Sequence, residues 1–62
     1  MKAKIFKDSD DTNLYLKVRY WDEPEEIWFD IWRCGEPISP TVGLKRRDVK
    51  RLINFLEKLL KG

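Results

Sequence analysis

Two strand-like segments place all three tryptophans and one of the two tyrosines of this chain on a single side of a sheet. Successive side chains in a strand point to opposite faces, so alternate positions of residues 14–21 and 27–33 form an apolar face, and the remaining positions form a second face. That second face consists of Tyr15, Lys17, Arg19, Trp21, Trp28, Asp30 and Trp32. A face that met only water would not need indoles. We therefore expect nucleic acid, a second subunit or another protein to cover it.

The length of 62 residues predicts one small domain that spans residues 1–62. A domain of this size buries only about 60 % of its unfolded surface and needs a further source of stability. Cys34 is the single cysteine, so an internal disulfide cannot form, and no apolar run approaches the ~20 residues of a membrane span. We therefore expect oligomerisation to supply the stability. A lone cysteine without a secretory signal predicts a cytoplasmic location, in the nucleoid if the protein binds DNA.

The net charge of +2 conceals an uneven distribution along the chain. Residues 1–32 hold five Lys/Arg and eight Asp/Glu, which sums to −3, and residues 33–62 hold eight and three, which sums to +5. The acids gather in two expected turns, at residues 8–11 and 22–26, and the bases gather at residues 45–51. This separation predicts a basic patch that attracts anions.

Turn-forming residues separate four short strand-like segments. The turn at residues 8–13 connects a strand at residues 3–6 to the strand at residues 14–21 as an antiparallel hairpin. The turn at residues 22–26, with Pro24 at its centre, leads into the strand at residues 27–33. Cys34-Gly35-Glu36-Pro37 marks a third turn, and a short fourth strand is expected at residues 41–44.

From about Arg46 the hydrophobic period changes from 2 to 3.6 residues, which indicates a helix. Its apolar arc contains Val49, Leu52, Ile53, Leu56 and Leu60. The predicted fold class is therefore α+β: a four-stranded antiparallel β-meander followed by one C-terminal amphipathic helix packed on one sheet face (ββββα).

Phe55 and Leu59 widen that arc to roughly 160°, against the ~100° of a typical surface helix. We assign these two residues to a dimer interface with a second copy. The alternative is that the small sheet curls around the helix and covers both of them.

The residue types that most enzymes need are missing. The chain has no histidine, its single cysteine cannot build a structural zinc site, and its three isolated glycines form no phosphate loop. The acidic turn at residues 8–11 lacks the spaced ligands of a calcium loop. The sequence predicts a non-enzymatic protein with no cofactor and no metal.

Three bases, Lys45, Arg46 and Arg47, stand at the expected start of the helix. Each is unfavourable there by about 0.3–1 kcal/mol, because the helix dipole is positive at this end. An anionic partner such as phosphate would turn the arrangement into an advantage. The alternative is a solubilising charge run balanced by Glu25 or Glu26, and the sequence leaves both possibilities open.

The aromatic and basic sheet face has the residue types that sequence-tolerant single-strand binding uses. Unstacked bases lie on aromatic rings, each worth about 1–3 kcal/mol, while Lys and Arg follow the phosphates. Asp30 in the middle of this face counts against a phosphate track. The alternative is that Trp21, Trp28 and Trp32 are buried against another subunit or partner, as aromatic anchors commonly are.

The stretch from Ile27 to Leu60 resembles the single-stranded-DNA-binding domain of the transcriptional positive cofactor four family. Trp28-Phe29-Asp30-Ile31 is similar to the family's apolar-Asp-Ile strand, and Val42-Gly43-Leu44 before the helix is similar to its strand-to-helix junction. Trp32 stands where the family has an Arg. The resemblance implies a curved four-stranded sheet with a C-terminal helix, dimerisation largely through the helices, and single-strand binding across aromatic and basic strand positions.

These observations predict a homodimer that binds single-stranded nucleic acid, DNA rather than RNA, and that does not associate with membranes. The expected binding residues are Tyr15, Lys17, Arg19, Trp21, Trp28, Trp32, Lys45, Arg46 and Arg47. One alternative is a protein-interaction module whose tryptophan face is a subunit or partner interface. Another is a dimeric transcription regulator that reads duplex DNA.

Overall fold

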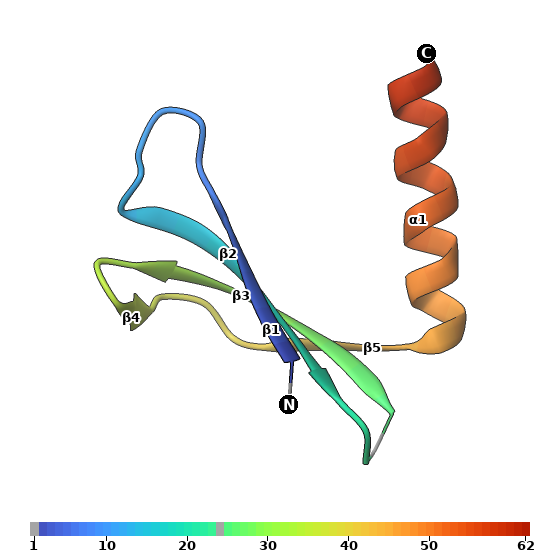
Figure 1. Cartoon of the computed structure of the whole chain (residues 1–62), viewed down its shortest axis with the longest axis horizontal. Coiled ribbons are helices and arrows are strands. Elements are labelled where there is room, and N and C mark those ends of the chain that lie inside the picture. Colours follow the sequence, from blue (N-terminus) through green and yellow to red (C-terminus); the bar gives the residue numbers. More distant parts are fainter. Residues whose placement is uncertain (1, 24) are drawn as a thin grey trace.

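The chain is described by a computed structural model that covers residues 2–23 and 25–62. Its elements are β1 (Lys2–Lys7), β2 (Leu14–Trp21), β3 (Glu26–Arg33), β4 (Glu36–Pro37), β5 (Val42–Lys45) and α1 (Arg46–Lys61). An antiparallel sheet of four strands with a two-residue fifth strand, followed by one C-terminal helix, confirms the predicted α+β class (Figure 1). Pro24, expected at the centre of the second turn, lies outside the described residues.

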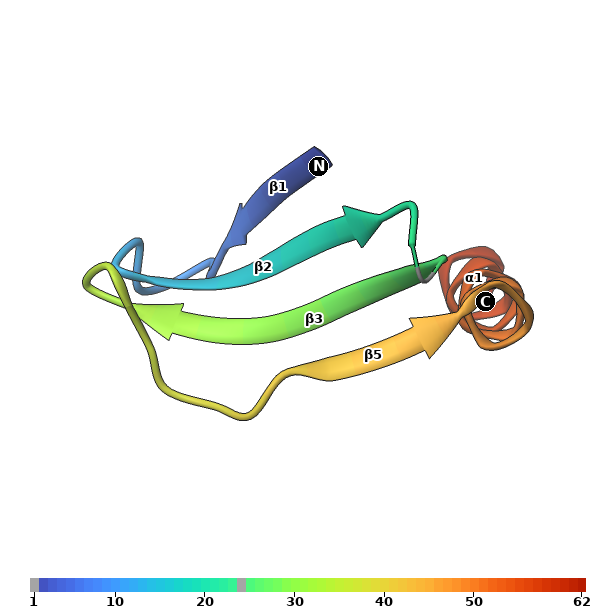
Figure 2. The same cartoon turned by 90° about the horizontal axis from the view of Figure 1, so that it is seen from below.

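The sheet is a meander in which β1, β2 and β3 are neighbours in chain order, with β5 on the far side of β3 (Figure 2). β5 covers the first half of β3, and β4 covers its last two residues. Tyr15 lies opposite Trp32 and Arg19 lies opposite Trp28, so the register joins the two predicted aromatic faces into one. Residues paired in this way share a face of the sheet.

The sheet has two chemically different faces. The aromatic face carries Ala3, Ile5, Lys7, Tyr15, Lys17, Arg19, Trp21, Glu26, Trp28, Asp30, Trp32, Pro37, Gly43 and Lys45. The apolar face carries Phe6, Leu14, Leu16, Val18, Tyr20, Ile27, Phe29, Ile31, Val42 and Leu44, with the charged residues Lys2, Lys4, Arg33 and Glu36 at its margins. The alternation of the sequence therefore survives intact in the folded chain.

Local side-chain and backbone chemistry closes the turns. The Asp8 carboxylate accepts hydrogen bonds from the backbone N–H groups of Asp10 and Asp11, both at 3.0 Å, which is typical of an Asx turn. Cys34 and Gly35 both have positive φ angles, 51° and 81°. Two such residues between paired strands form the tight turn that suits the twist of a hairpin, here between β3 and β4.

A serine fills the gap between β4 and β5 along the edge of β3. The Ser39 hydroxyl accepts a hydrogen bond from the backbone N–H of Ile31 at 2.9 Å, and the Ile31 carbonyl accepts one from Ile38. Because an unmade backbone hydrogen bond is costly, these two contacts keep the edge of β3 satisfied where no ladder partner is present.

The sequence predicted a helix packed on one face of the sheet, but α1 does not lie across that face. β5 ends at Lys45 and α1 begins at Arg46, with no connecting loop. The helix therefore leaves from the end of the sheet, packs against β5 and β3 among the described strands, and rises beside the sheet (Figure 1). Packing across the whole apolar face would need a reversal of the chain that this junction lacks.

Burial in the described residues is slight. Asp30, 4 % exposed, is the only residue among them that is fully buried, and none of their apolar side chains reaches that level. The best-covered part of the chain is therefore the aromatic face around Asp30.

Candidate nucleic-acid interface

The aromatic face holds two pairs of rings, one toward each end of β2 and β3. Tyr15 and Trp32 are stacked, with ring centroids 6.4 Å apart and an interplanar angle of 17°. Trp21 and Trp28 are tilted by 45°, with centroids 5.0 Å apart. Trp28 and Trp32 are four residues apart on β3, so the two ring pairs are separated by about 13 Å along the strand.

A cation lies over one ring of each pair. The Lys17 ammonium is 4.2 Å from the centroid of Trp32, and the Arg19 guanidinium is 5.6 Å from that of Trp28. Both distances are within the range of cation–π attraction. The positive charges are thus held over one face of each of these two rings.

An ion pair occupies the centre of the face, between the two ring pairs. The Arg19 Nη2 donates to the Asp30 Oδ2 at 2.8 Å. The side chain of Asp30 is almost completely covered, whereas that of Arg19 keeps some exposure. The carboxylate that counted against a phosphate track in the sequence is therefore covered and neutralised by its neighbour.

Two residues that the sequence analysis did not identify position the Trp28 ring. A Cβ at Gly43 would lie 3.2 Å from Cδ1 and Nε1 of the Trp28 indole, so glycine leaves room for the ring and a side chain there would require the ring to move. The Trp28 Nε1 also donates to the Glu26 carboxylate at 3.0 Å. Gly43 and Glu26 are thus positioning residues of the face, and the one available signal was a glycine inside a short strand.

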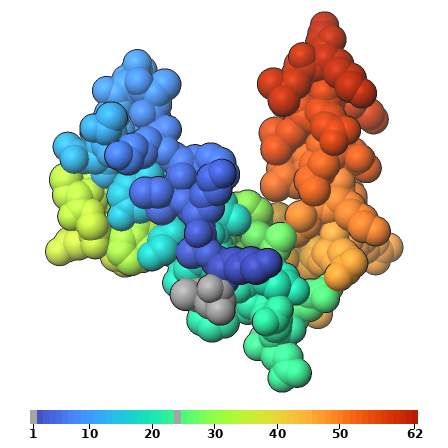
Figure 3. All heavy atoms as spheres, in the orientation of Figure 1, coloured from blue at the N-terminus to red at the C-terminus, as the bar shows by residue number. Residues whose placement is uncertain are grey.

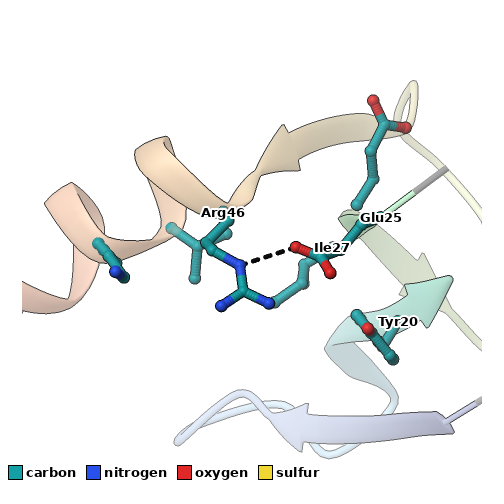
Figure 4. Close-up of a pocket in the computed structure, with 7 residues that line it drawn as sticks. Tyr20, Glu25, Ile27 and Arg46 are labelled. Atoms are coloured by element: carbon teal, nitrogen blue, oxygen red, sulfur yellow. Dashed lines mark hydrogen bonds and ion pairs between the residues drawn. The ribbon is translucent and has the colours of Figure 1, made fainter. Parts of the chain in front are cut away.

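The three basic residues at the start of the helix lie in different environments. The Arg46 Nε donates to the Glu25 carboxylate at 2.7 Å, on the side of a small pocket that also contains Tyr20 and Ile27 (Figure 4). The hydrogen bond from Arg46 lowers the pKa of Glu25, and the carboxylate raises the pKa of Arg46. This contact is the intramolecular balance that the sequence left open, and it takes Arg46 away from the aromatic face.

The other two bases are placed differently. Lys45 lies opposite Glu26 in the ladder between β3 and β5, at the edge of the aromatic face. Arg47 is exposed in the first turn of α1. Of the nine expected binding residues, the structure gathers seven on the aromatic face, with Arg46 and Arg47 on the helix.

The two residues assigned to a dimer interface are on the helix surface. Phe55 is 59 % exposed and Leu59 is 60 % exposed. Neither side chain is covered by the sheet of its own chain, so a sheet curled around the helix does not account for the wide apolar arc.

The described residues hold no group of three or more His, Cys, Asp or Glu side chains that could bind a metal ion. The acidic turn uses its carboxylates on its own backbone, since Asp8 and Asp11 both accept from nearby N–H groups. In the same part of the chain, no helix has both the length and the apolar character needed to cross a bilayer.

No family model, curated protein or solved structure matches this chain.

Proposed function

We propose that this protein is a non-enzymatic, sequence-tolerant single-stranded nucleic-acid-binding protein that acts as a dimer and binds the strand on its aromatic face. One observation carries the proposal: all three tryptophans lie on one sheet face, in two ring pairs that each have a cation over one of their rings. The resemblance of residues 27–60 to the positive cofactor four family supports the same function, with DNA as the preferred strand.

The chemistry of the face suits a single strand better than a duplex. Every base has a π-face, so stacking on Trp or Tyr tolerates any sequence, while cations beside the rings attract the phosphates. Lys7, Lys17 and Lys45 supply charge around the rings, and Asp30 is already neutralised by Arg19. A duplex would hide its base faces and would require an element shaped to a groove.

The exposed apolar side chains favour a ligand, rather than a protein partner, on the aromatic face. Most of the strongly exposed apolar residues of the sheet, including Phe6, Leu16, Ile31 and Val42, belong to the opposite face. A protein interface would gain more from those side chains than from rings already packed on one another. The aromatic face therefore remains available for nucleic acid.

A reducing compartment fits this function. Cys34 is free and exposed at the tip of the β3–β4 turn. An exposed thiol is best tolerated inside the cell, where disulfides rarely form. We propose that the protein acts in the cytoplasm, bound to nucleic acid.

Alanine substitution of the two β3 tryptophans tests the proposal. Trp28→Ala and Trp32→Ala should each weaken binding of a fluorescein-labelled oligothymidine, measured by anisotropy, by about 1–3 kcal/mol, because each removes one stacking ring. The matched controls Trp28→Phe and Trp32→Phe keep a ring and should retain most of the affinity. If the alanine variants bind as tightly as the wild type, or if the wild type does not bind at low salt, the proposed function is wrong.

A further inference from the structure

Two large apolar surfaces have no partner among the described residues of this chain. On the apolar sheet face, Phe6, Leu16, Ile31 and Val42 are all more than a third exposed. On α1 the exposed apolar residues are Ile53, Phe55, Leu56, Leu59 and Leu60. Exposed apolar area of this extent marks an interaction surface in a soluble protein.

The total accessible surface shows how much area is uncovered. The chain exposes 5369 Å². A compact monomer of 7.5 kDa is expected to expose about 4,200 Å², so the excess is about 1,100 Å². If two copies buried that excess against each other, the interface would total about 2,200 Å², which lies in the range of obligate homodimers. The missing area therefore matches one second copy of the same chain.

The two surfaces flank an open space. Among the described strands α1 packs against β5 and β3, and Figure 3 shows it standing apart from the β1–β2 hairpin, with a hollow between them. The base of this hollow is the pocket that Tyr20 and Ile27 of the sheet form with Val49 of the helix. Tyr20 and Ile27 belong to the apolar face, so that face looks into the hollow.

We propose that a second copy of this chain fills the hollow, so that the apolar arc of each α1 lies on the apolar sheet face of the other copy. The dimensions agree: a helix of 16 residues is about 24 Å long, and the eight-residue strands β2 and β3 are about 26 Å long. Two-fold symmetry makes each contact occur twice, as in other closed dimers.

Reciprocal exchange covers more apolar surface than the simpler arrangement. If the helices paired only with each other, Phe6, Leu16 and Ile31 of the sheet would stay in water. If each helix lay on the partner's sheet, Phe55 and Leu59 would be buried together with those sheet residues. The junction between β5 and α1, which lacks a loop, also prevents the helix from covering its own sheet in this way.

This assembly would supply the dimer of the proposed function, but strand binding on the aromatic face does not depend on it. Only the apolar face and the helix arc take part in it, so the aromatic faces of both copies stay accessible. A failure of nucleic-acid binding would not affect the dimer, and a failure of the dimer would not by itself remove the stacking rings.

The first test is the wild-type protein at several concentrations. A chain that is folded only as a dimer should sediment at twice its mass at micromolar concentration. Its Tm should rise by about 5 °C for each tenfold increase in concentration, because assembly and folding are then one equilibrium. A monomer with a concentration-independent Tm would overturn the proposal, and binding of that monomer to anionic vesicles would instead assign the helix to a lipid surface.

The second test is cysteine cross-linking, which distinguishes helix-on-sheet exchange from other dimers. Cys34→Asn removes the native thiol and keeps a residue that tolerates positive φ. In that background, Leu56→Cys marks the helix and Leu16→Cys marks the sheet. A mixture of the two variants, refolded together and oxidised, should give a helix-to-sheet disulfide dimer as its main product.

Two other products would contradict the exchange. A Leu56→Cys protein that cross-links efficiently to itself would show helix-to-helix pairing. A chain carrying both cysteines that closes within one molecule would show the helix on its own sheet. A matched control, Lys58→Cys on the opposite arc of α1, should not cross-link to Leu16→Cys, and cross-linking at that position would show that the disulfides are unspecific.

Discussion

Replacement of Asp30 by Asn should lower the stability of the protein and at the same time raise its affinity for single strands. Asp30 is covered and accepts a hydrogen bond from Arg19, whose side chain is 18 % exposed. A hydrogen bond to a charged group contributes about 1.5–3 kcal/mol, and Asn keeps the shape but loses the charge. For a domain of this size the loss corresponds to a decrease of roughly 10 °C in Tm.

The expected gain in binding has the same origin. Without the carboxylate, the Arg19 guanidinium is free to meet a phosphate between the two ring pairs. One additional contact steepens the dependence of log K on log salt by about 0.7 for a single strand. Affinity for oligothymidine should therefore rise at low salt in Asp30→Asn, measured by anisotropy at temperatures well below its Tm.

Variants of Arg19 provide the controls. Arg19→Gln leaves a buried carboxylate without a partner, which costs about 3–5 kcal/mol, and it should weaken binding. The double variant Arg19→Gln/Asp30→Asn should be more stable than Arg19→Gln alone, because the buried charge is removed. The reasoning is refuted if Asp30→Asn binds more weakly than the wild type while remaining folded, since phosphates would then not approach this part of the face.

Three further predictions concern the edge of the aromatic face and the helix start. Gly43→Ala places a Cβ 3.2 Å from the Trp28 indole, so the ring must shift. Both the Trp emission and the single-strand affinity should therefore change. An unchanged affinity would contradict the positioning role of Gly43. Lys45→Gln should weaken strand binding and flatten the dependence of log K on log salt by about 0.7, because Lys45 lies at the edge of the aromatic face. Arg46→Gln should leave that slope nearly unchanged, because Arg46 is already paired with Glu25. A larger effect of Arg46→Gln than of Lys45→Gln would place the phosphates at the helix start. The pKa of Glu25 is lowered in the folded state, so the stability that its carboxylate contributes is present above its ordinary pKa of 4.5 and is lost as the pH falls through the folded value. The Tm values of the wild type and Glu25→Gln should therefore differ at pH 7 and converge in acid. A difference that stays constant with pH would show that the ion pair does not cause it.

Strand alternation and helical periodicity were enough to predict the elements and both faces of the sheet. The strand expected at residues 27–33 is Glu26–Arg33 in the structure, and the helix expected from about Arg46 begins there. These features depend on local periods of 2 and 3.6, which a sequence displays directly. The short strand β4 was read only as part of a turn, because two residues are too few to show a period.

Contacts between distant residues could not be predicted in the same way. The partner of Asp30 could have been any cation of the face, and only the register of β2 against β3 brings Arg19 within reach. The sequence offered Glu25 or Glu26 as the balance for the basic helix start, and the folded chain selects Glu25 for Arg46 and gives Glu26 to Trp28. The departure of α1 from the sheet depends on the junction at Lys45, whose effect appears only in three dimensions.

Intrinsic tryptophan fluorescence tests the central claim most directly, because all three tryptophans of the chain lie on the aromatic face and the emission reports on that face alone. The wild-type protein should be titrated with oligothymidine and with a duplex of equal charge, at about 20 mM and about 200 mM salt. If bases stack on the rings, the single strand should quench the emission strongly, the duplex should quench it little, and the affinity for the single strand should fall at the higher salt. An emission that no strand changes at the lower salt, where electrostatic attraction is greatest, would contradict single-strand binding on this face.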